Sequence, residues 1–471
     1  MRILIVGNDP NEIGGVANYT RPLATKYAEM GHDVFYLYSG AYASKYNMRF
    51  RPYIKRNRNN FPFECAELFN SSCLPFNYGH PQRDISMPDM DEVINDYLNN
   101  IKPDVMHVHS RLGLPFSINR LASNLGISVI NTIHVYGYIC QKRVMIDHLG
   151  EPCRGPFDLV KCSICTGKQD IAAEFRRARI RSFKEFVKAR SGVLYGLMQR
   201  TKRTSKIDWS PGVVRNDIST TERSADPVLA ELLRTRLEAG QETLNRFSDL
   251  TICVSNDVRQ TLKSFGVNEA KLHVQHIGST IAERQKQSDQ SLCEPIVIGN
   301  IGGVNYYKGT HVFLDAIARL NRSDFRVKIF GKYDENYVAK LMKGRESLPI
   351  EFTGRYHPDE LPKILKQIDI MVLPSICNDT APQTIFESFS GGVPIIASNI
   401  GGFPDFIDHD ANGLLFEPGN SEDLAAKIDY ILDNPDRIYA YKKNIPKLKT
   451  ISENAAELIA LYGNLFSNRT L

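Results

Sequence analysis

The sequence lacks the long apolar runs of a membrane-spanning protein. None of its 471 residues falls within an uninterrupted apolar span of about 18 residues, the length that indicates a transmembrane helix. The first apolar run, ILIVG, is short and is soon followed by Asn8, Asp9 and Glu12, so we expect no cleavable signal peptide. With only 32 glycines and 24 prolines, the chain is not fibrous or disordered. We therefore expect a globular protein in the cytoplasm.

Cysteine is also scarce, and one common nucleotide-binding motif is missing. The nine cysteines are an odd number, and in a reducing compartment they are expected as thiols or metal ligands rather than disulfides. The loop after the first apolar run, NDPNEIGGVANYT, does not contain GxGxxG. This absence argues against a nicotinamide-dependent dehydrogenase.

The length and the pattern of apolar segments predict an α/β protein with two doubly wound domains. At 471 residues the chain exceeds the size of one hydrophobic core. Short β-rich runs such as RILIVGN, VMHVHS and SVINTIH alternate with helical segments, and the pattern restarts at IVIGNIG, which is typical of parallel sheets covered by helices. We expect an N-terminal domain over residues 1–285 with an insertion at about 140–240, a C-terminal domain over 286–450, and a last helix over 451–471 that packs back on the first domain.

Polar motifs follow several of the predicted strands. In parallel sheets, ligands bind at the carboxyl ends of the strands, and here that would be a cleft between the two domains. Gly14 and Gly15 stand between the first strand and a helix, where backbone amides can face an anion, although a plain tight turn is the alternative. Lys308 in IGGVNYYKG could face a phosphate or could simply be solvated, and Gly401 and Gly402 in SNIGGFPDF predict another close backbone approach.

The stretch NDTAPQTIFESFSGGVP places two acids eight residues apart, in different local settings. Asp379 lies in a loop, where it could also serve as a helix N-cap. Glu387 lies within the helix that follows, and since a buried carboxylate without a partner is costly, we expect it to meet hydroxyls or a cation.

The string LPSICNDTAPQTIFESFSGGVPIIASNIGGFPDFI, with Lys308 and Gly309 in the domain's first loop, resembles the retaining glycosyltransferases of family 4, which belong to glycosyl transferases group 1 and have the GT-B architecture. The hallmark of that family is two glutamates separated by seven residues. Here the first position is Asp379, whose side chain is one methylene shorter, and the second is Glu387.

The resemblance implies a role for each of these residues. Asp379, with the amides around Gln383 and Thr384, would hold the hydroxyls and phosphate of a nucleotide-sugar, and Glu387 would accept hydrogen bonds from the ribose. Lys308, helped by the loop at Gly14 and Gly15, would neutralise the diphosphate. Such enzymes use the leaving diphosphate to deprotonate the acceptor on the same face, and these donor motifs imply no cofactor for donor binding.

Four more positions follow from the same resemblance. The family usually places an arginine five residues before the lysine, whereas this sequence has Gly303 there. Arg355 could replace that arginine, but the resemblance places it, beside Tyr356, on the nucleobase side of the site. His134 matches an active-site histidine that contacts the transferred sugar, and a strand-end histidine satisfied by the backbone is the alternative.

Two further segments are not explained by the donor motifs. Cys140, Cys153, Cys162 and Cys165 fall within 26 residues, a spacing that could give four thiolates to a structural zinc ion, with His148 as a spare ligand; free thiols are the alternative. Residues 176–206 carry eleven lysines and arginines against one acid, with apolar residues at near-helical spacing. That segment could lie on an anionic membrane surface or be an ordinary domain helix, and its aromatic residues do not favour nucleic acid.

The sequence as a whole predicts a retaining hexosyltransferase of glycan or polysaccharide biosynthesis. It would use a UDP- or GDP-sugar and a saccharide or lipid-linked saccharide acceptor, in the cytoplasm or on the inner face of the membrane. A non-catalytic nucleotide-sugar-binding scaffold and a nucleotide-sugar epimerase are the alternatives. The sugar, nucleobase, acceptor and linkage depend on loops without a generic signature.

Overall fold

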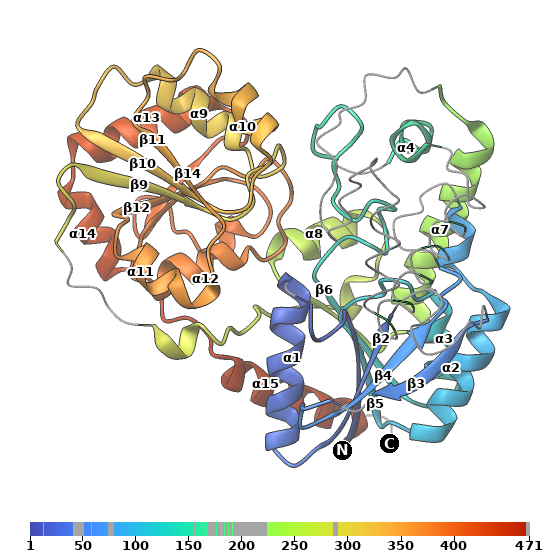
Figure 1. Cartoon of the computed structure of the whole chain (residues 1–471). Coiled ribbons are helices and arrows are strands. Elements are labelled where there is room, and N and C mark those ends of the chain that lie inside the picture. Colours follow the sequence, from blue (N-terminus) through green and yellow to red (C-terminus); the bar gives the residue numbers. More distant parts are fainter. Residues whose placement is uncertain are drawn as a thin grey trace.

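The computed structural model of the protein forms two α/β lobes, each built around its own sheet (Figure 1). It describes residues 1–12, 14–40, 51–57, 59–73, 80–153, 157–167, 224–285 and 291–467, together with Arg176, Ile180, Phe183, Val187 and Ser191.

The N-terminal domain contains an eight-stranded sheet in the order β3-β4-β2-β1-β5-β6-β7-β8. Its strands are β1 (Arg2–Gly7), β2 (Asp33–Ser39), β3 (Tyr53–Asn57), β4 (Glu64–Phe69), β5 (Val105–Val108), β6 (Ser128–Ile133), β7 (Leu250–Cys253) and β8 (Leu272–Val274). All neighbouring pairs are parallel except β3 and β4, which pair antiparallel at the edge. This edge hairpin was not anticipated, because β3 is half exposed and its charged sequence, YIKRN, resembles a loop more than a buried strand.

The C-terminal domain contains a six-stranded parallel sheet in the order β11-β10-β9-β12-β13-β14. Its strands are β9 (Ile296–Ile301), β10 (Phe325–Phe330), β11 (Ile350–Gly354), β12 (Ile370–Leu373), β13 (Ile395–Ser398) and β14 (Gly413–Phe416). The central strands β12 and β13 are buried throughout, as expected where helices cover both faces of a parallel sheet. Strand order reverses between β9 and β12, which is the place where doubly wound sheets bind ligands.

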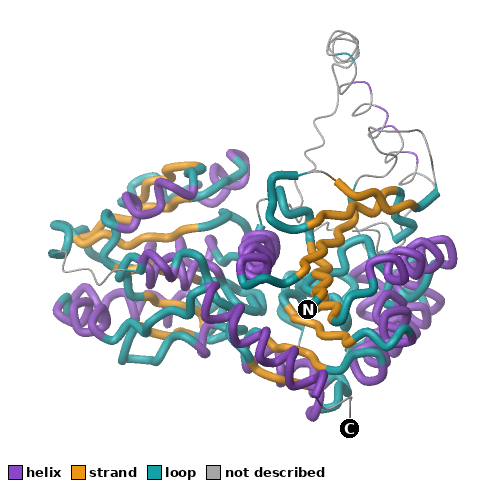
Figure 2. Tube along the Cα trace, turned by 90° about the horizontal axis from the view of Figure 1, so that it is seen from below, coloured by secondary structure: helices purple, strands orange, loops and turns teal. Residues whose placement is uncertain are grey.

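Helices cover both sheets, as the view from below shows (Figure 2). The N-terminal domain has α1 (Gly15–Glu29), α2 (Pro88–Ile101), α3 (Ser117–Asn124), α4 (Leu159–Thr166), α7 (Pro227–Arg246) and α8 (Asn256–Ser264). The C-terminal part has α9 (Thr310–Arg319), α10 (Glu335–Met342), α11 (Leu361–Leu365), α12 (Gln383–Ser390), α13 (Ser421–Asp433), α14 (Asp436–Lys443) and α15 (Ile451–Ser467). Local sequence explains several starts: at α7, for example, the Asp226 carboxylate accepts from the amides of Val228 and Leu229 and Pro227 opens the helix.

The last helix, α15, lies beside α1 of the N-terminal domain (Figure 1). The hydroxyls of Tyr27 and Tyr462 are 2.8 Å apart, and the hydroxyl of Tyr19 donates to the side chain of Asn454 at 2.7 Å. All four side chains are buried. Helix α15 is therefore held against the first domain by buried rings whose hydroxyls have hydrogen-bond partners.

The basic segment 176–206, which we predict to lie on a membrane surface or in a domain helix, falls outside the described residues apart from five single positions. Among the helices that the structure describes, none combines the length and the apolar character needed to span a bilayer.

Candidate functional site

Two loops at the carboxyl edge of the second sheet bring Lys308 and Asp379 together. Lys308 follows β9 and Asp379 follows β12, the two adjacent strands at which the order reverses. The Lys308 Nζ lies 2.6 Å from Asp379 Oδ2, and the hydroxyl of Ser375 donates to the same oxygen at 3.1 Å. Burial by itself lowers the pKa of Lys308, but Asp379, Cys377 and Glu387 more than offset it and the pKa is raised. Lys308 therefore stays a cation at neutral pH.

Glycines allow these two loops to approach so closely. Gly309, next to Lys308, has a φ of 68° and its Cα faces the backbone of Pro374, where a Cβ would collide with the carbonyl. Gly401 has a φ of 59°, and a Cβ there would collide with the backbone of Asp379. The Gly402 amide donates to the Asp379 carbonyl at 2.7 Å. Gly309 thus lets the loop of Lys308 approach Pro374, and Gly401 and Gly402 let a third loop pack on the backbone of Asp379.

Glu387 lies on α12 and is partly buried. Burial raises its pKa to about 7, although Lys308 opposes the shift. Burial and the nearby Glu387 also raise the pKa of Tyr356, whose side chain packs against the core. Among the described residues, no side chain or amide donates a hydrogen bond to the Glu387 carboxylate, which is partly exposed and therefore open to a ligand.

Helix α12 begins without a side-chain cap. Its N-cap is Pro382, and no side chain accepts from the first amides, those of Gln383 and Thr384. The alternative interpretation of Asp379 as the N-cap of this helix is therefore wrong, because its carboxylate is engaged by Lys308 instead. The start of α12 presents unpaired amides beside the Lys308–Asp379 pair, an arrangement that favours an anion.

The remaining residues expected near a donor surround this edge less closely. Gly303 lies in the loop of Lys308, five residues before it. A Cβ added at Gly303 would have the side chain of Asn305 as its nearest neighbour. Arg355 follows β11 and is exposed, with no ion pair to any described residue. Gly14 and Gly15 open α1, and nothing lies within 4 Å of a Cβ added at either glycine. Packing therefore does not require these two glycines, which leaves their backbone open to a ligand.

The facing edge of the first sheet carries three histidines. His107 lies on β5, His109 follows that strand directly, and His134 follows β6. His109 Nδ1 lies 3.1 Å from His134 Nε2, and His107 bonds to Thr132 at 2.7 Å. Burial lowers the pKa of His134 to about 4 and that of His107 to about 3, so both rings are neutral at neutral pH. The ring of Tyr19, on α1, lies 5.2 Å from that of His134.

His134 is thus held by other side chains, and not only by backbone as the alternative interpretation supposed. The sequence analysis did not identify His109 or Tyr19. VMHVHS is a buried strand that ends in polar residues, and that signal could have found His109.

The two edges meet directly. The hydroxyl of Thr380, next to Asp379, donates to the carbonyl of His134 at 2.7 Å. On another side, the backbone of Gly150 lies against the ring of Tyr306, near Lys308. The residues expected to act on a donor therefore lie where the domains touch.

The four clustered cysteines lie in the segment that contains Gly150. An isolated antiparallel β-bridge pairs Ile146 with Pro152, and the Cys153 amide donates to the Met145 carbonyl. The Cys165 thiol lies 3.7 Å from the Ile146 carbonyl. Burial raises the pKa of Cys153 and Cys162 to about 12, and neighbouring cysteines add to both shifts. Nevertheless, within the described residues no group of three or more histidine, cysteine or acidic side chains is arranged to hold a metal ion. The zinc site stays a prediction, as does the role of His148.

Comparison with known proteins finds a family match in the second half of the chain. Residues 282–456 match the model of the family described as glycosyl transferases group 1. Among curated proteins, the sulfoquinovosyl transferase SQD2 of Arabidopsis thaliana is 28% identical over 203 residues, which cover 40% of this chain and 39% of that protein. A putative colanic acid biosynthesis glycosyltransferase, WcaL of Salmonella typhimurium, is 24% identical over 226 residues, 46% of this chain and 55% of that protein. The matches thus span only about half of these relatives.

Solved structures extend the likeness to the whole chain. The sucrose-phosphate synthase of Thermosynechococcus elongatus superposes with a TM-score of 0.63 at 15% identity and covers 99% of both chains. HepE of Anabaena, solved in complex with UDP, superposes with a TM-score of 0.59 at 14% identity and covers 98% of this chain and 100% of its own. At these identities the likeness shows the fold alone, and the fold is GT-B, as the sequence analysis predicted.

Proposed function

We propose that the chain, whose residues 282–456 match the family model of glycosyl transferases group 1, transfers a hexosyl unit from a UDP- or GDP-sugar, with retention of configuration, to a saccharide or lipid-linked saccharide. The observation that carries the proposal is the contact between Lys308 and Asp379 at the switch point of the second sheet, near the carboxylate of Glu387 and the uncapped start of α12.

On the donor side, each group has a complementary task. The Lys308 ammonium and the free amides of Gln383 and Thr384 would bind the diphosphate, whose negative charge grows as the sugar leaves. Glu387 would accept hydrogen bonds from the ribose hydroxyls, since no described protein group donates to its carboxylate. Asp379 would accept from sugar hydroxyls while it keeps Lys308 charged and oriented.

On the acceptor side, the transferred sugar would lie against His134. Its ring is neutral because burial lowers its pKa to about 4, so it can exchange hydrogen bonds with sugar hydroxyls without adding a charge. In the reaction, the bond from the anomeric carbon to the diphosphate oxygen breaks and the bond to the acceptor oxygen forms on the same face. The proton of the acceptor hydroxyl passes to the leaving diphosphate oxygen.

HepE is solved with UDP, which supports a uridine nucleotide as the first candidate donor. One feature favours a non-catalytic scaffold instead, namely Gly303 at the position where the family usually has a second cation. The exposed Arg355 would supply that charge only if β11 and its loop approach the diphosphate.

A donor screen tests the proposal and separates it from the scaffold. The purified chain is mixed with UDP-, GDP-, ADP- and dTDP-sugars, and melting temperature and release of free nucleotide are measured. We expect one nucleotide-sugar to raise the melting temperature and to be hydrolysed slowly, and transfer to pooled saccharides should give an α- or β-product that matches the donor's configuration. Stabilisation without release would support the scaffold, and no response to any donor would contradict both.

A further inference from the structure

His109 contacts His134, the histidine expected to meet the transferred sugar, and neighbouring rings hold both imidazoles in place. Nδ1 of His109 lies 3.1 Å from Nε2 of His134. The ring centre of Tyr19 lies 5.6 Å from that of His109 and 5.2 Å from that of His134. The ring centre of His107 lies 3.9 Å from that of His109. The packing therefore sets which nitrogens of the two imidazoles face each other.

Each ring of this pair carries one proton at neutral pH. Burial lowers the pKa of His134 to about 4, and burial together with the two neighbouring histidines lowers the pKa of His109 well below its ordinary value. A neutral imidazole has one N–H and one acceptor nitrogen, so the two facing nitrogens form a hydrogen bond when only one of them carries a proton. Which nitrogen of a histidine is protonated is then set by the hydrogen bond that the other one makes.

Two arrangements satisfy this condition. In the first, His109 donates from Nδ1, its Nε2 is bare, and His134 carries its own proton on Nδ1. In the second, His134 donates from Nε2, its Nδ1 is bare, and His109 carries its own proton on Nε2. The arrangements thus differ in the buried Nε2 of His109 and in what His134 presents at Nδ1.

Nε2 of His109 decides between the two arrangements. This atom is buried and has no hydrogen-bond partner in the described part of the chain. The nearest ring cannot supply one, because both nitrogens of His107 bond to the hydroxyls of Tyr462 and Thr132. Among buried backbone groups, an N–H without an acceptor is rarer than a carbonyl without a donor, and the same desolvation argument applies to an imidazole. The first arrangement, in which Nε2 is bare, is therefore favoured.

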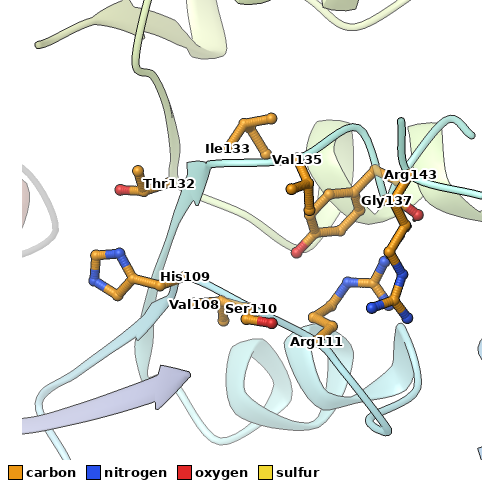
Figure 3. A pocket seen from close by; sticks show the side chains of 10 residues that line it. Val108, His109, Ser110, Arg111, Thr132, Ile133, Val135, Gly137 and Arg143 are labelled. Atoms are coloured by element: carbon orange, nitrogen blue, oxygen red, sulfur yellow. Dashed lines mark hydrogen bonds between the residues drawn. The ribbon is translucent and has the colours of Figure 1, made fainter. Parts of the chain in front are cut away.

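Charged side chains do not set the position of this proton. Figure 3 shows the ring of His109 extending away from Arg111 and Arg143. In the described part of the chain, burial and the neighbouring histidines account for the lowered pKa of His109, and burial accounts for that of His134. The buried Nε2 thus remains the group that distinguishes the arrangements.

The other nitrogen of His134 is open to a ligand. His134 is partly exposed, and none of the described residues forms a hydrogen bond with its Nδ1. Its carbonyl accepts from Thr380, next to Asp379, so the residue lies where the two domains meet and where the proposed donor would place its sugar. In the first arrangement, Nδ1 presents an N–H at this place.

We propose that His109 is a positioning residue that fixes His134 as the Nδ1–H tautomer, so that His134 donates a hydrogen bond to an oxygen of the transferred sugar. The contact with the sugar rests on the proposed function. The tautomer is a property of the protein alone and can be tested without any donor.

The tautomer test is nuclear magnetic resonance of the full chain with histidine isotopically labelled at its ring nitrogens, at neutral pH and without ligand. Couplings between the ring nitrogens and the carbon-bound ring protons tell a protonated nitrogen from a bare one, and single substitutions assign the signals. We expect both His109 and His134 to carry the proton on Nδ1. A proton on Nε2 of His134, or a mixture of its two tautomers, would overturn the proposal.

Variants show whether His109 sets the tautomer. His109→Phe keeps an aromatic ring but removes the nitrogen that faces His134, so His134 should lose its single Nδ1–H form. His109→Asn supplies an amide N–H near the position of Nδ1 and should restore that form. Thr132→Val is the matched control, because it removes a buried hydrogen bond from the neighbouring His107 and should leave the His134 tautomer unchanged. A single Nδ1–H form of His134 in a folded His109→Phe chain would overturn the proposal, and if that chain does not fold, the spectrum of the parent still decides.

A kinetic test separates this inference from the proposed function. His109→Phe should lower the turnover of donor hydrolysis roughly fivefold, because one hydrogen bond to the sugar is lost, and His109→Asn should recover it. The affinity for the nucleoside diphosphate, which lacks the transferred sugar, should not change. Unchanged turnover, or an equal fall in turnover and nucleotide affinity, would overturn the positioning role. A parent chain that never releases nucleotide refutes the transferase, whereas the tautomer holds or fails on its own spectrum.

Discussion

The two sheet edges that meet at the candidate site handle charge in opposite ways. On the C-terminal edge, Lys308 and Asp379 compensate each other, and Glu387 has its pKa raised to about 7. On the N-terminal edge, burial keeps His134 neutral, with a pKa of about 4. Under the proposed function, the first edge would bind the diphosphate and hydroxyls of the donor, and the second would contact a neutral sugar.

Under the proposed function, the two edges divide the work between donor and acceptor. The proposed donor groups lie in residues that match a family model, in the loops after β9 and β12 and on helix α12. The histidines of the facing edge lie on or just after β5 and β6, outside the matched residues. Loops on a rigid sheet tolerate change, so specificity is expected to lie there.

The largest effect is expected from Lys308→Ala. Removing one preorganised charge from a developing anion typically costs roughly 100- to 1,000-fold in turnover, and we expect a loss of this size with a smaller loss of donor affinity. Steady-state kinetics of donor hydrolysis measure both. Lys328→Ala is the control, because Lys328 bonds to Gln367 on the same sheet away from the site. Equal losses of turnover in the two variants would mean that the Lys308 charge has no special role.

The next effect concerns the Cys-rich segment, which belongs to the N-terminal domain but touches Tyr306 of the other. Protein purified without chelator should contain about one zinc per chain, and Cys162→Ser should remove it and lower the melting temperature. Elemental analysis and thermal unfolding measure both quantities. Cys293→Ser, outside the cluster, should change neither. A metal-free parent protein would leave the cysteines as thiols.

Glu387→Ala should weaken nucleotide binding by about 10- to 100-fold, because hydrogen bonds to a charged group contribute roughly 1.5–3 kcal/mol. Calorimetry with the nucleoside diphosphate from the donor screen measures the affinity. Glu351→Ala, an exposed glutamate of β11, is the control. An affinity equal to that of the parent would remove Glu387 from the ribose role.

The same carboxyl should make stability depend on pH. Its pKa is about 7 in the folded chain against an ordinary value of 4.5, so the folded state holds the proton more tightly. That contribution is full below pH 4.5 and is lost as pH rises through 7. Relative to the parent, Glu387→Gln should therefore gain about 3 kcal/mol in free energy of unfolding between pH 4.5 and pH 8. Denaturant titrations at the two pH values, without nucleotide, would contradict the assignment if the difference stays constant.

The smallest effect is expected where the edges touch. Thr380→Val removes the hydrogen bond to the His134 carbonyl and should lower the free energy of unfolding by about 1 kcal/mol. Thr353→Val removes a similar bond to the Ile329 carbonyl inside one domain. If only Thr353→Val destabilises the chain, the contact between the domains contributes nothing measurable.

The sequence by itself determined the α/β fold, the restart of the pattern at the second domain, the loops in which Lys308 and Asp379 lie and the helix that carries Glu387. It could do so because buried parallel strands read as short apolar runs, and ligand-binding loops follow their carboxyl ends. It missed the β3–β4 edge, since an exposed, charged strand has no apolar pattern.

Only the tertiary structure decided which charges compensate each other. Lys308 and Asp379 are 71 residues apart, and Arg236 and Asp84 are 152 apart, so no local spacing joins them. The pairing of Arg236 with Asp84 depends on how distant helices and loops of the N-terminal domain pack. Electrostatic compensation acts through a few ångströms of space, and that is the information that a linear sequence does not display.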